Sequence, residues 1–264
     1  MKRSGIAVIL TVACMSTTAP LCAQEAFNTP EFPTPRASLF RTSDLIYAGL
    51  FFGSLAAIYP AEGFDEALSP GSPPTGLGAS VSSAGRLAGN GFFAYGVGGA
   101  TFLAGKALGQ GQVARIGLRS LEALLLSDLI VTPFKFAVGR QRPYGLDPDS
   151  DEFAPFAFNN ESFSFPSGHT AHMFAIASTL SRELGHQAPW VPYVAYSAAA
   201  LTGVGRVVGQ RHWVTDVLAG AAAGLFAGHF VGRLHGEEFI GLPFTPVISA
   251  GDGGVYVGAN IRFR

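Results

Sequence analysis

The sequence contains little charge and almost no cysteine. Charged residues make up 13% of its 264 positions, against about 25% in an ordinary soluble domain, and its mean hydropathy is +0.32. Both cysteines, Cys14 and Cys22, lie near the N-terminus. If that segment is removed, the mature chain can be neither a disulfide scaffold nor a thiol enzyme. The small charged fraction indicates that lipid or a very large core covers the apolar residues.

An excess of basic residues is also missing. The chain has 17 Lys and Arg against 18 Asp and Glu, with a formal net charge of −1 and a pI of about 6.6. Nucleic-acid-binding domains normally carry a basic face or a high pI, so this class of partner is excluded. A phosphate-bearing ligand would have to be held by a few local cations.

The first 23 residues have the pattern of a secretory signal peptide. Lys2 and Arg3 precede an apolar run over 6–13, and small residues follow as far as Ala23, which is the order of such signals. Because Leu21 is large for a cleavage site, an uncleaved anchor remains an alternative. We expect export to the cell envelope, either in the inner membrane with a site facing the periplasm or as a soluble periplasmic protein.

The rest of the chain predicts an all-α bundle with a short C-terminal β-hairpin. A proline-rich linker occupies 24–43, and the helical domain spans 44–236. Gly/Pro/Ser-rich residues 69–83 predict a loop, and β-formers around the turn at 251–254 predict a hairpin within the tail 237–264. Five to six apolar helices are expected, over 44–59, 91–108, 113–136, 170–184, 191–204 and 214–231.

The lengths of these apolar runs do not decide whether the bundle crosses a membrane. None of them reaches the roughly 18 uninterrupted apolar residues that mark a confident span. Their many glycines would weaken helices in water, but small residues let helices approach closely in a bilayer. A membrane-embedded bundle and a compact periplasmic bundle therefore both remain open.

The first of three polar blocks places Lys135 and Arg142 seven residues apart, directly before Pro143. On a continuous helix both cations would share a face, whereas Pro143 favours a helix end at Arg142. Either arrangement lets an Arg fork and a Lys point charge converge on one anion. Taken alone, the pair also fits an ordinary helix C-terminus with cations that favour the dipole.

The second block, Pro166-Ser167-Gly168-His169, comes directly before an apolar helical run. It predicts a helix N-terminus, where free backbone N–H groups and the dipole attract an anion. Gly168 allows close approach of the backbone to a ligand, Ser167 offers a hydroxyl, and His169 can deliver a proton. An ordinary Ser-Gly cap with a surface histidine is the alternative.

The third block contains Arg206, His212 and Asp216. His212 and Asp216 are four residues apart, so on a helix they share a face and the carboxylate can bond one ring nitrogen. That bond would orient a histidine nucleophile, although such pairs are also common surface contacts. Arg206 can join the cation cluster.

Together the three blocks resemble the type 2 phosphatidic acid phosphatase superfamily, which also includes class A acid phosphatases and vanadium haloperoxidases. The family pattern is Lys, six residues and Arg-Pro; then Pro-Ser-Gly-His; then Ser-Arg, five residues, His, three residues and Asp. The chain departs from it at Gly205, where the family has Ser. This puts one minor phosphate contact in doubt.

The resemblance implies a phosphatase without a metal or other cofactor. His212 would attack phosphorus to form a phosphohistidine, Asp216 would orient it, and His169 would protonate the leaving oxygen. The phosphate would be held by Lys135, Arg142 and Arg206, with help from Ser167 and the Gly168 backbone. The substrate would be a lipid phosphate or pyrophosphate, with the leaving group (lipid, undecaprenyl carrier, sugar or nucleotide) left open.

Three other functions remain open at this stage: a soluble non-specific acid phosphatase of the periplasm, a vanadate-dependent haloperoxidase, and a phospholipid-binding envelope protein without turnover. Further polar residues have simpler explanations. Arg140 is interpreted as a solvated rim charge rather than an additional phosphate donor. We expect Asp128 to pair with a nearby basic group, and His172 could line the site or, with His169, bind zinc.

Overall fold

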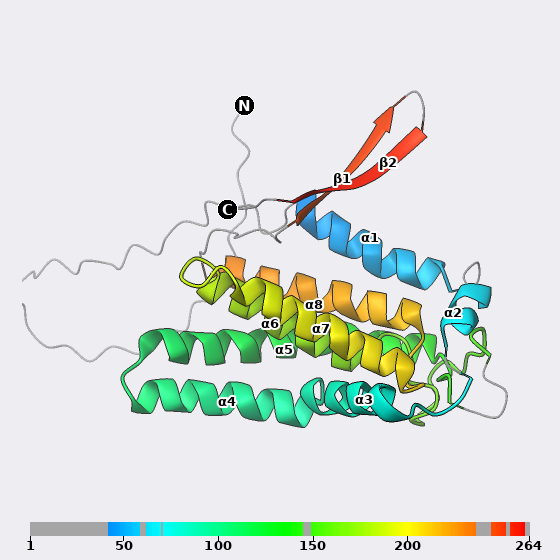
Figure 1. Ribbon diagram of the computed structural model, residues 1–264, viewed down its shortest axis with the longest axis horizontal. Coiled ribbons are helices and arrows are strands. Elements are labelled where there is room, and N and C mark those ends of the chain that lie inside the picture. Colours follow the sequence, from blue (N-terminus) through cyan, green and yellow to red (C-terminus); the bar gives the residue numbers. More distant parts are fainter. Residues whose placement is uncertain are drawn as a thin grey trace, which may run out of the picture. The chain divides into compact units, whose positions relative to one another are not determined.

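The computed structural model describes residues 42–58, 62–69, 71–144, 149–235, 244–251 and 254–261. Within these ranges the chain forms eight helices and one antiparallel hairpin (Figure 1). The elements are α1 (Thr42–Ala56), α2 (Glu62–Leu68), α3 (Gly76–Ala88), α4 (Gly91–Ala107), α5 (Gly111–Val138), α6 (Gly168–Leu184), α7 (Val191–Val208), α8 (Val214–Leu234), β1 (Phe244–Gly251) and β2 (Gly254–Ile261).

The predicted fold class is confirmed: all six expected helices are present, and the expected hairpin is formed by β1 and β2. The predicted signal peptide and all but the last two residues of the predicted linker lie outside the described residues. The loop expected over 69–83 is wrong in its second half, because α3 begins at Gly76. Its small residues pack tightly on α7, where a Cβ on Gly85 would lie 3.0 Å from the Thr202 carbonyl oxygen.

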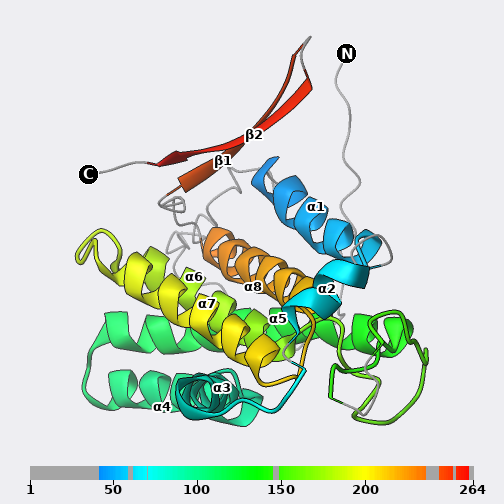
Figure 2. The ribbon, with the colours of Figure 1, turned by 45° about the vertical axis from the view of Figure 1, so that its right-hand side comes forward.

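Helix α8 lies at the centre of the packing. It contacts α6, α1 and α5, and Figure 2 shows these helices around it. Glycines along one face of α8 allow its backbone to touch α6 directly: a Cβ on Gly220 would overlap Ser167, and one on Gly224 would overlap Ala171. Small residues at such spacing let two helix backbones approach closely. The approach fixes the start of α6 against the start of α8.

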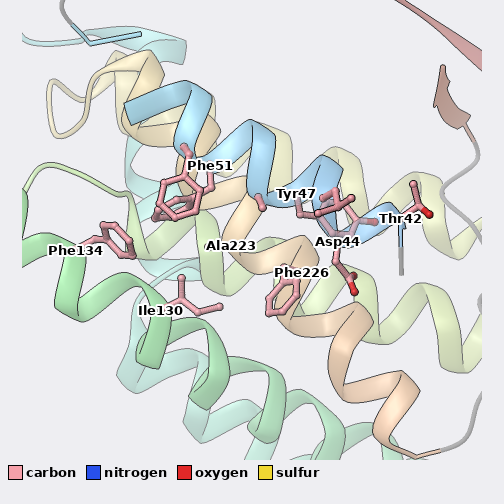
Figure 3. A pocket seen from close by; sticks show the side chains of 11 residues that line it. Thr42, Asp44, Tyr47, Phe51, Ile130, Phe134, Ala223 and Phe226 are labelled. Atoms are coloured by element: carbon pink, nitrogen blue, oxygen red, sulfur yellow. The ribbon is translucent and has the colours of Figure 1, made fainter. Parts of the chain in front are cut away.

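Helix α1 packs on α8 and leaves an apolar cavity beside α5. The two helices are joined by an ion pair between Asp44 and Arg233 at 2.9 Å. The cavity measures about 610 Å³ and lies between α1, α5 and α8 (Figure 3). Its lining is almost entirely apolar: Thr42, Asp44, Leu45, Tyr47, Ala48, Phe51, Phe52, Ile130, Phe134, Ala223 and Phe226.

Among the described residues, one helix is both long and apolar enough to cross a membrane, and that helix is α8, most of which is buried in the bundle. Large apolar side chains are nevertheless exposed on the outer faces of other helices. Examples are Leu50 of α1, Phe92 of α4 and Leu129 of α5, at 50%, 94% and 64% exposure. Together they form an outer surface that suits an apolar environment better than water.

Candidate active site

The ends of four helices meet at one end of the bundle, on the right in Figure 1: the C-termini of α5 and α7 and the N-termini of α6 and α8. The first polar block lies at the end of α5. Lys135 is in its last turn, and the helix stops at Val138 because Gly139 adopts a left-handed conformation with φ of 62°. The sequence had suggested that the helix ends at Arg142, but the helix ends earlier and Arg142 follows it.

Lys135 and Arg142 converge on one loop carbonyl although no helix joins them. The Phe163 oxygen accepts from Lys135 Nζ at 3.1 Å and from Arg142 Nη2 at 3.3 Å. Lys135 Nζ also donates to the Pro166 oxygen at 2.5 Å, which draws it to the start of α6. The shared Phe163 acceptor places the two cations side by side, and the Pro166 bond places Lys135 at the second polar block.

The second block forms the N-terminus of α6, as predicted. Gly168 and His169 are partly exposed, and a Cβ on Gly168 would lie 3.8 Å from Cε of Lys135. The first N–H groups of a helix have no partner within it, so they add donors beside the lysine. Ser167 is fully buried, and its hydroxyl lies 2.9 Å from that of Thr170. The structure thus directs this hydroxyl into the protein.

The third block brings Arg206 to the same place. Arg206 is in the last turn of α7, and its carbonyl accepts from the backbone N–H groups of Arg211 and His212 at 3.0 and 3.3 Å. This turn accommodates the five residues between the arginine and the histidine. Within the described part of the chain, the Nε atoms of Arg142 and Arg206 are buried without a hydrogen-bond partner. Two guanidinium groups thus retain donors for an anion.

His212 lies just before α8, not on it as the sequence interpretation assumed. It is 2% exposed, and its Nδ1 lies 2.8 Å from the Ser164 carbonyl oxygen. Because a carbonyl oxygen can only accept, Nδ1 carries the proton. In the neutral ring the Nε2 atom then bears the lone pair. This is the tautomer that a nitrogen nucleophile requires.

Asp216 does not bond the His212 ring directly, in contrast to the expectation from their spacing. Its Oδ2 lies 3.7 Å from His212 Nδ1, which is beyond hydrogen-bond distance. It accepts instead from the Ser164 hydroxyl at 2.5 Å and from the Trp213 N–H at 2.8 Å. Asp216 therefore caps α8 and holds Ser164, whose carbonyl in turn holds the imidazole.

Burial lowers the pKa of His212 well below 6.5. The Asp216 carboxylate opposes the shift, whereas Lys135, Arg142 and Arg206 add to it. The ring therefore stays neutral at neutral pH and keeps its nucleophilic lone pair. The action of all three cations on one imidazole also shows that residues from the three blocks form a single site.

His169 completes the set of residues expected from the sequence. Burial and the positive charges of Arg206, Lys135 and Arg142 lower the pKa of its ring to about 3. His169 therefore lies at the same cluster from the α6 side and is neutral at neutral pH until an anion offsets these charges. It is partly exposed, whereas His212 is nearly covered. This difference suits a group that exchanges protons with a leaving oxygen or with water.

Arg140 corrects the sequence interpretation most clearly, because it is fully buried instead of lying at a solvated rim. Its guanidinium donates to Asp216 Oδ1 at 2.9 Å, to Asp65 Oδ2 at 3.0 Å and to Thr215 Oγ1 at 2.7 Å. Asp65 also accepts from the Thr215 hydroxyl at 2.5 Å. No sequence pattern pointed to Asp65, since it lies in a short helix far from the three blocks.

The departure from the family pattern at Gly205 has a steric cause. A Cβ at this position would lie 2.6 Å from the carbonyl oxygen of Val81 in α3. The α3 backbone thus occupies the space into which a serine side chain would point. Glycine at 205 accommodates the packing of α3 on α7.

The completed arrangement could bind an anion beside the neutral ring of His212. Three cations and the N-terminus of α6 surround the position next to His212, and fixed donors of this kind stabilise the charge of a tetrahedral oxyanion. His169 can exchange a proton there. The geometry suits transfer of a phosphoryl group to a histidine.

Sequence comparisons agree with this arrangement. The sequence profile of the PAP2 superfamily matches residues 117–239. The chain is 38% identical to a lipid A 1-phosphatase of Porphyromonas gingivalis over 42% of its own length and 23% of that protein. It is 28% identical to a lipid A 4'-phosphatase of the same organism over 56% of its length and 61% of that protein. The chain thus spans less than two thirds of the curated relatives it matches.

A solved structure supports the fold. The transmembrane PAP2-type phosphatidylglycerolphosphate phosphatase from Bacillus subtilis superposes with a TM-score of 0.52 at 24% identity, over 72% of this chain and 96% of that one. The profile match includes Lys135, Arg142, the second block and Arg206 to Asp216. Residues 117–239, which carry the three blocks, therefore match the PAP2 superfamily.

Proposed function

We propose that this protein is a lipid phosphatase that works through a phosphohistidine on His212. The observation that carries the proposal is the convergence of Lys135, Arg142 and Arg206 on a neutral imidazole whose Nδ1 is already bonded to Ser164. A structural histidine would not need three cations around a free ring nitrogen. A nucleophile that attacks a phosphate dianion does need such cations, because they stabilise the negative charge of the phosphoryl group.

The reaction proceeds in two steps. The bound phosphate dianion offsets the three cations, so that His169 takes up a proton. The Nε2 lone pair of His212 attacks phosphorus, the bond from phosphorus to the leaving oxygen breaks, and the protonated His169 donates its proton to that oxygen. Water then attacks phosphorus, His169 accepts a proton from this water, and the phosphorus–nitrogen bond breaks to release inorganic phosphate. The negative charge of Asp216 favours the cationic ring of the intermediate, and the hydrogen bond to Ser164 keeps its orientation.

A lipid substrate is supported by the cavity beside the site. Phe51 and Phe134 lie together at one end of it, and Thr42 and Asp44 lie toward the other (Figure 3). Phe51 also contacts Phe165, with ring centroids 5.9 Å apart, and Phe165 directly precedes the second block. From Thr42 to Phe52 the cavity follows α1 for about 15 Å at 1.5 Å per residue. An acyl chain along it would leave its phosphate at the site end of the bundle.

The cellular location of the protein is inferred from its exposed apolar surface, its relatives and its N-terminal segment. The exposed apolar faces of α1, α4 and α5 suit a bilayer, and the relatives named above act on lipid A. The signal-like N-terminus and the site at one end of the bundle favour an inner-membrane protein that faces the periplasm. A phosphorylated membrane lipid, as a monoester or a pyrophosphate, is the substrate class that fits these features.

The direct test is phosphate release by the detergent-purified protein from lipid phosphates and from soluble phosphomonoesters. We expect turnover of lipid phosphates, loss of turnover in His212→Gln, and full turnover in His186→Gln, which changes an exposed histidine between α6 and α7. Activity on soluble esters alone would favour a non-specific acid phosphatase. Full activity of folded His212→Gln would refute the nucleophile.

A further inference from the structure

The turn between α3 and α4 lies directly against His169. A Cβ on Gly89 would come within 2.6 Å of the His169 carbonyl oxygen and 2.8 Å of its Cα. Such distances leave room for no side chain at position 89. The Gly89 backbone itself therefore packs against the backbone and Cβ of His169. This turn precedes residues 117–239, which match the family profile, and the three blocks gave no sign of it.

His172 ties this turn to the bundle. It lies one helical turn after His169 on the same side of α6, and it is 6% exposed. Its Nδ1 donates to the Gly89 carbonyl oxygen, 3.1 Å away, and its Nε2 lies 2.8 Å from Asp128 Oδ1. Both ring nitrogens are therefore engaged. His172 can deliver a proton to a substrate, or bind a metal, only by giving up one of these bonds.

The chain of contacts continues into α4 and α5. The Tyr95 hydroxyl donates to Asp128 Oδ2 at 2.9 Å, so both carboxylate oxygens of Asp128 are engaged, as expected for a residue paired with a basic group. The Tyr95 ring meets the His172 ring edge-on, with centroids 6.2 Å apart. Tyr95, Asp128 and His172 thus join α4, α5 and α6 beside the turn that contacts His169.

We propose that His172 is a positioning residue that, through the Gly89 carbonyl, holds His169 in place for proton transfer to the leaving group. The inference rests on the proposed function, because it takes His169 as the acid. It goes beyond that function in assigning a task to Tyr95, Asp128 and His172. Of these, Asp128 also acts electrostatically on Lys135. A fixed donor geometry matters most when the leaving oxygen needs a proton.

The test compares phenyl phosphate with p-nitrophenyl phosphate, because the two are similar in size but only phenolate leaves poorly without protonation. The quantity to measure is kcat/KM, which reports formation of the phosphohistidine. In His172→Leu we expect about a tenfold loss for phenyl phosphate and less than about a twofold loss for p-nitrophenyl phosphate, as for a partly misplaced general acid. Where only lipids are turned over, a lipid monophosphate and a lipid diphosphate supply the same contrast.

Conservative variants separate positioning from packing. His172→Asn keeps a donor near the Nδ1 position and is expected to recover phenyl phosphate turnover, whereas His172→Gln keeps one near Nε2 and is not. Tyr95→Phe removes a single hydroxyl, so it remains informative if His172→Leu does not fold. We expect it to cause a smaller loss with the same preference for phenyl phosphate.

His169→Gln separates this inference from the proposed function. We expect it to show the same selective loss, to a larger extent. If it does not, His169 is not the acid and the proposed function needs revision. If His169→Gln shows the selective loss but His172→Leu and Tyr95→Phe lose activity equally on both esters, or lose none, the positioning inference is wrong and the proposed function stands.

Discussion

Asp216 holds Ser164: its carboxylate accepts the Ser164 hydroxyl at 2.5 Å, and the Ser164 carbonyl in turn accepts the His212 Nδ1–H at 2.8 Å. The carboxylate thus orients the His212 ring through an intermediate residue, because its own distance to Nδ1 is 3.7 Å. Arg140 then fixes the carboxylate from the other side. The positioning of His212 depends on Ser164, which lies outside the three sequence blocks, and on Arg140, which lies within the first block without being one of its predicted site residues.

Ser164→Ala tests the link from Asp216 through Ser164 to His212. It removes the hydroxyl that ties Ser164 to Asp216 but keeps the carbonyl that holds His212. Loss of one hydrogen bond of about 1.4 kcal/mol corresponds to about a tenfold lower rate of phosphoryl transfer. Single-turnover kinetics measures this rate. Ser162→Ala changes another fully buried serine and should leave it unchanged; equal rates in the two variants would contradict the linkage.

Arg140→Met is expected to act on stability. It leaves Asp65 and Asp216 buried without their cation, and breaking a buried ion pair in this way costs about 3–5 kcal/mol. Arg142→Met, at a cation that faces the site, should abolish turnover with a much smaller effect on unfolding. Thermal and denaturant unfolding of both variants checks this. A stable but inactive Arg140→Met would instead indicate that Arg140 binds phosphate.

The cavity predicts a selective change in substrate binding. Ala48 is an exposed alanine that lines it, and Ala48→Phe would displace part of an acyl chain. Losing the burial of about two CH₂ groups, at about 0.8 kcal/mol each, raises KM for a long-chain lipid phosphate about tenfold. Ala104→Phe, on an exposed position of α4, is the matched control. An equal rise for short-chain and long-chain substrates would show that the chain lies elsewhere.

The lowered pKa of His212 sets the pH dependence. Because the folded protein holds this ring neutral, the nucleophile stays active as the pH falls through 6.5, and the acid limb of kcat/KM should lie below that value. The unfolded chain takes up a proton on this residue near pH 6.5 and the folded one does not, so His212 lowers stability as the pH falls below 6.5.

The pH–rate profile and a pH series of thermal unfolding measure these two effects. Substrates with different second phosphate pKa values separate ionisation of the enzyme from that of the substrate. An acid limb at or above 6.5 that does not move with the substrate would contradict a depressed His212.

The sequence revealed the three blocks because each is local, and their joint spacing carries the chemistry. It could not show that Arg140 is buried, since that depends on Asp65, 75 positions away in a helix without a recognisable pattern. The helix α3 was missed for a related reason. Its Gly- and Ser-rich composition is typical of a loop, and what stabilises it is a backbone contact with Thr202 on α7.

The central claim is that phosphate passes through His212. Rapid acid-free quenching of the enzyme with a ³²P-labelled lipid phosphate, followed by alkaline denaturation and peptide mapping, measures this directly. The account predicts an alkali-stable, acid-labile label on the peptide containing His212, absent from His212→Asn and retained in His186→Gln. Turnover by the wild type without such a label under single-turnover conditions, or a label on another residue, would contradict it.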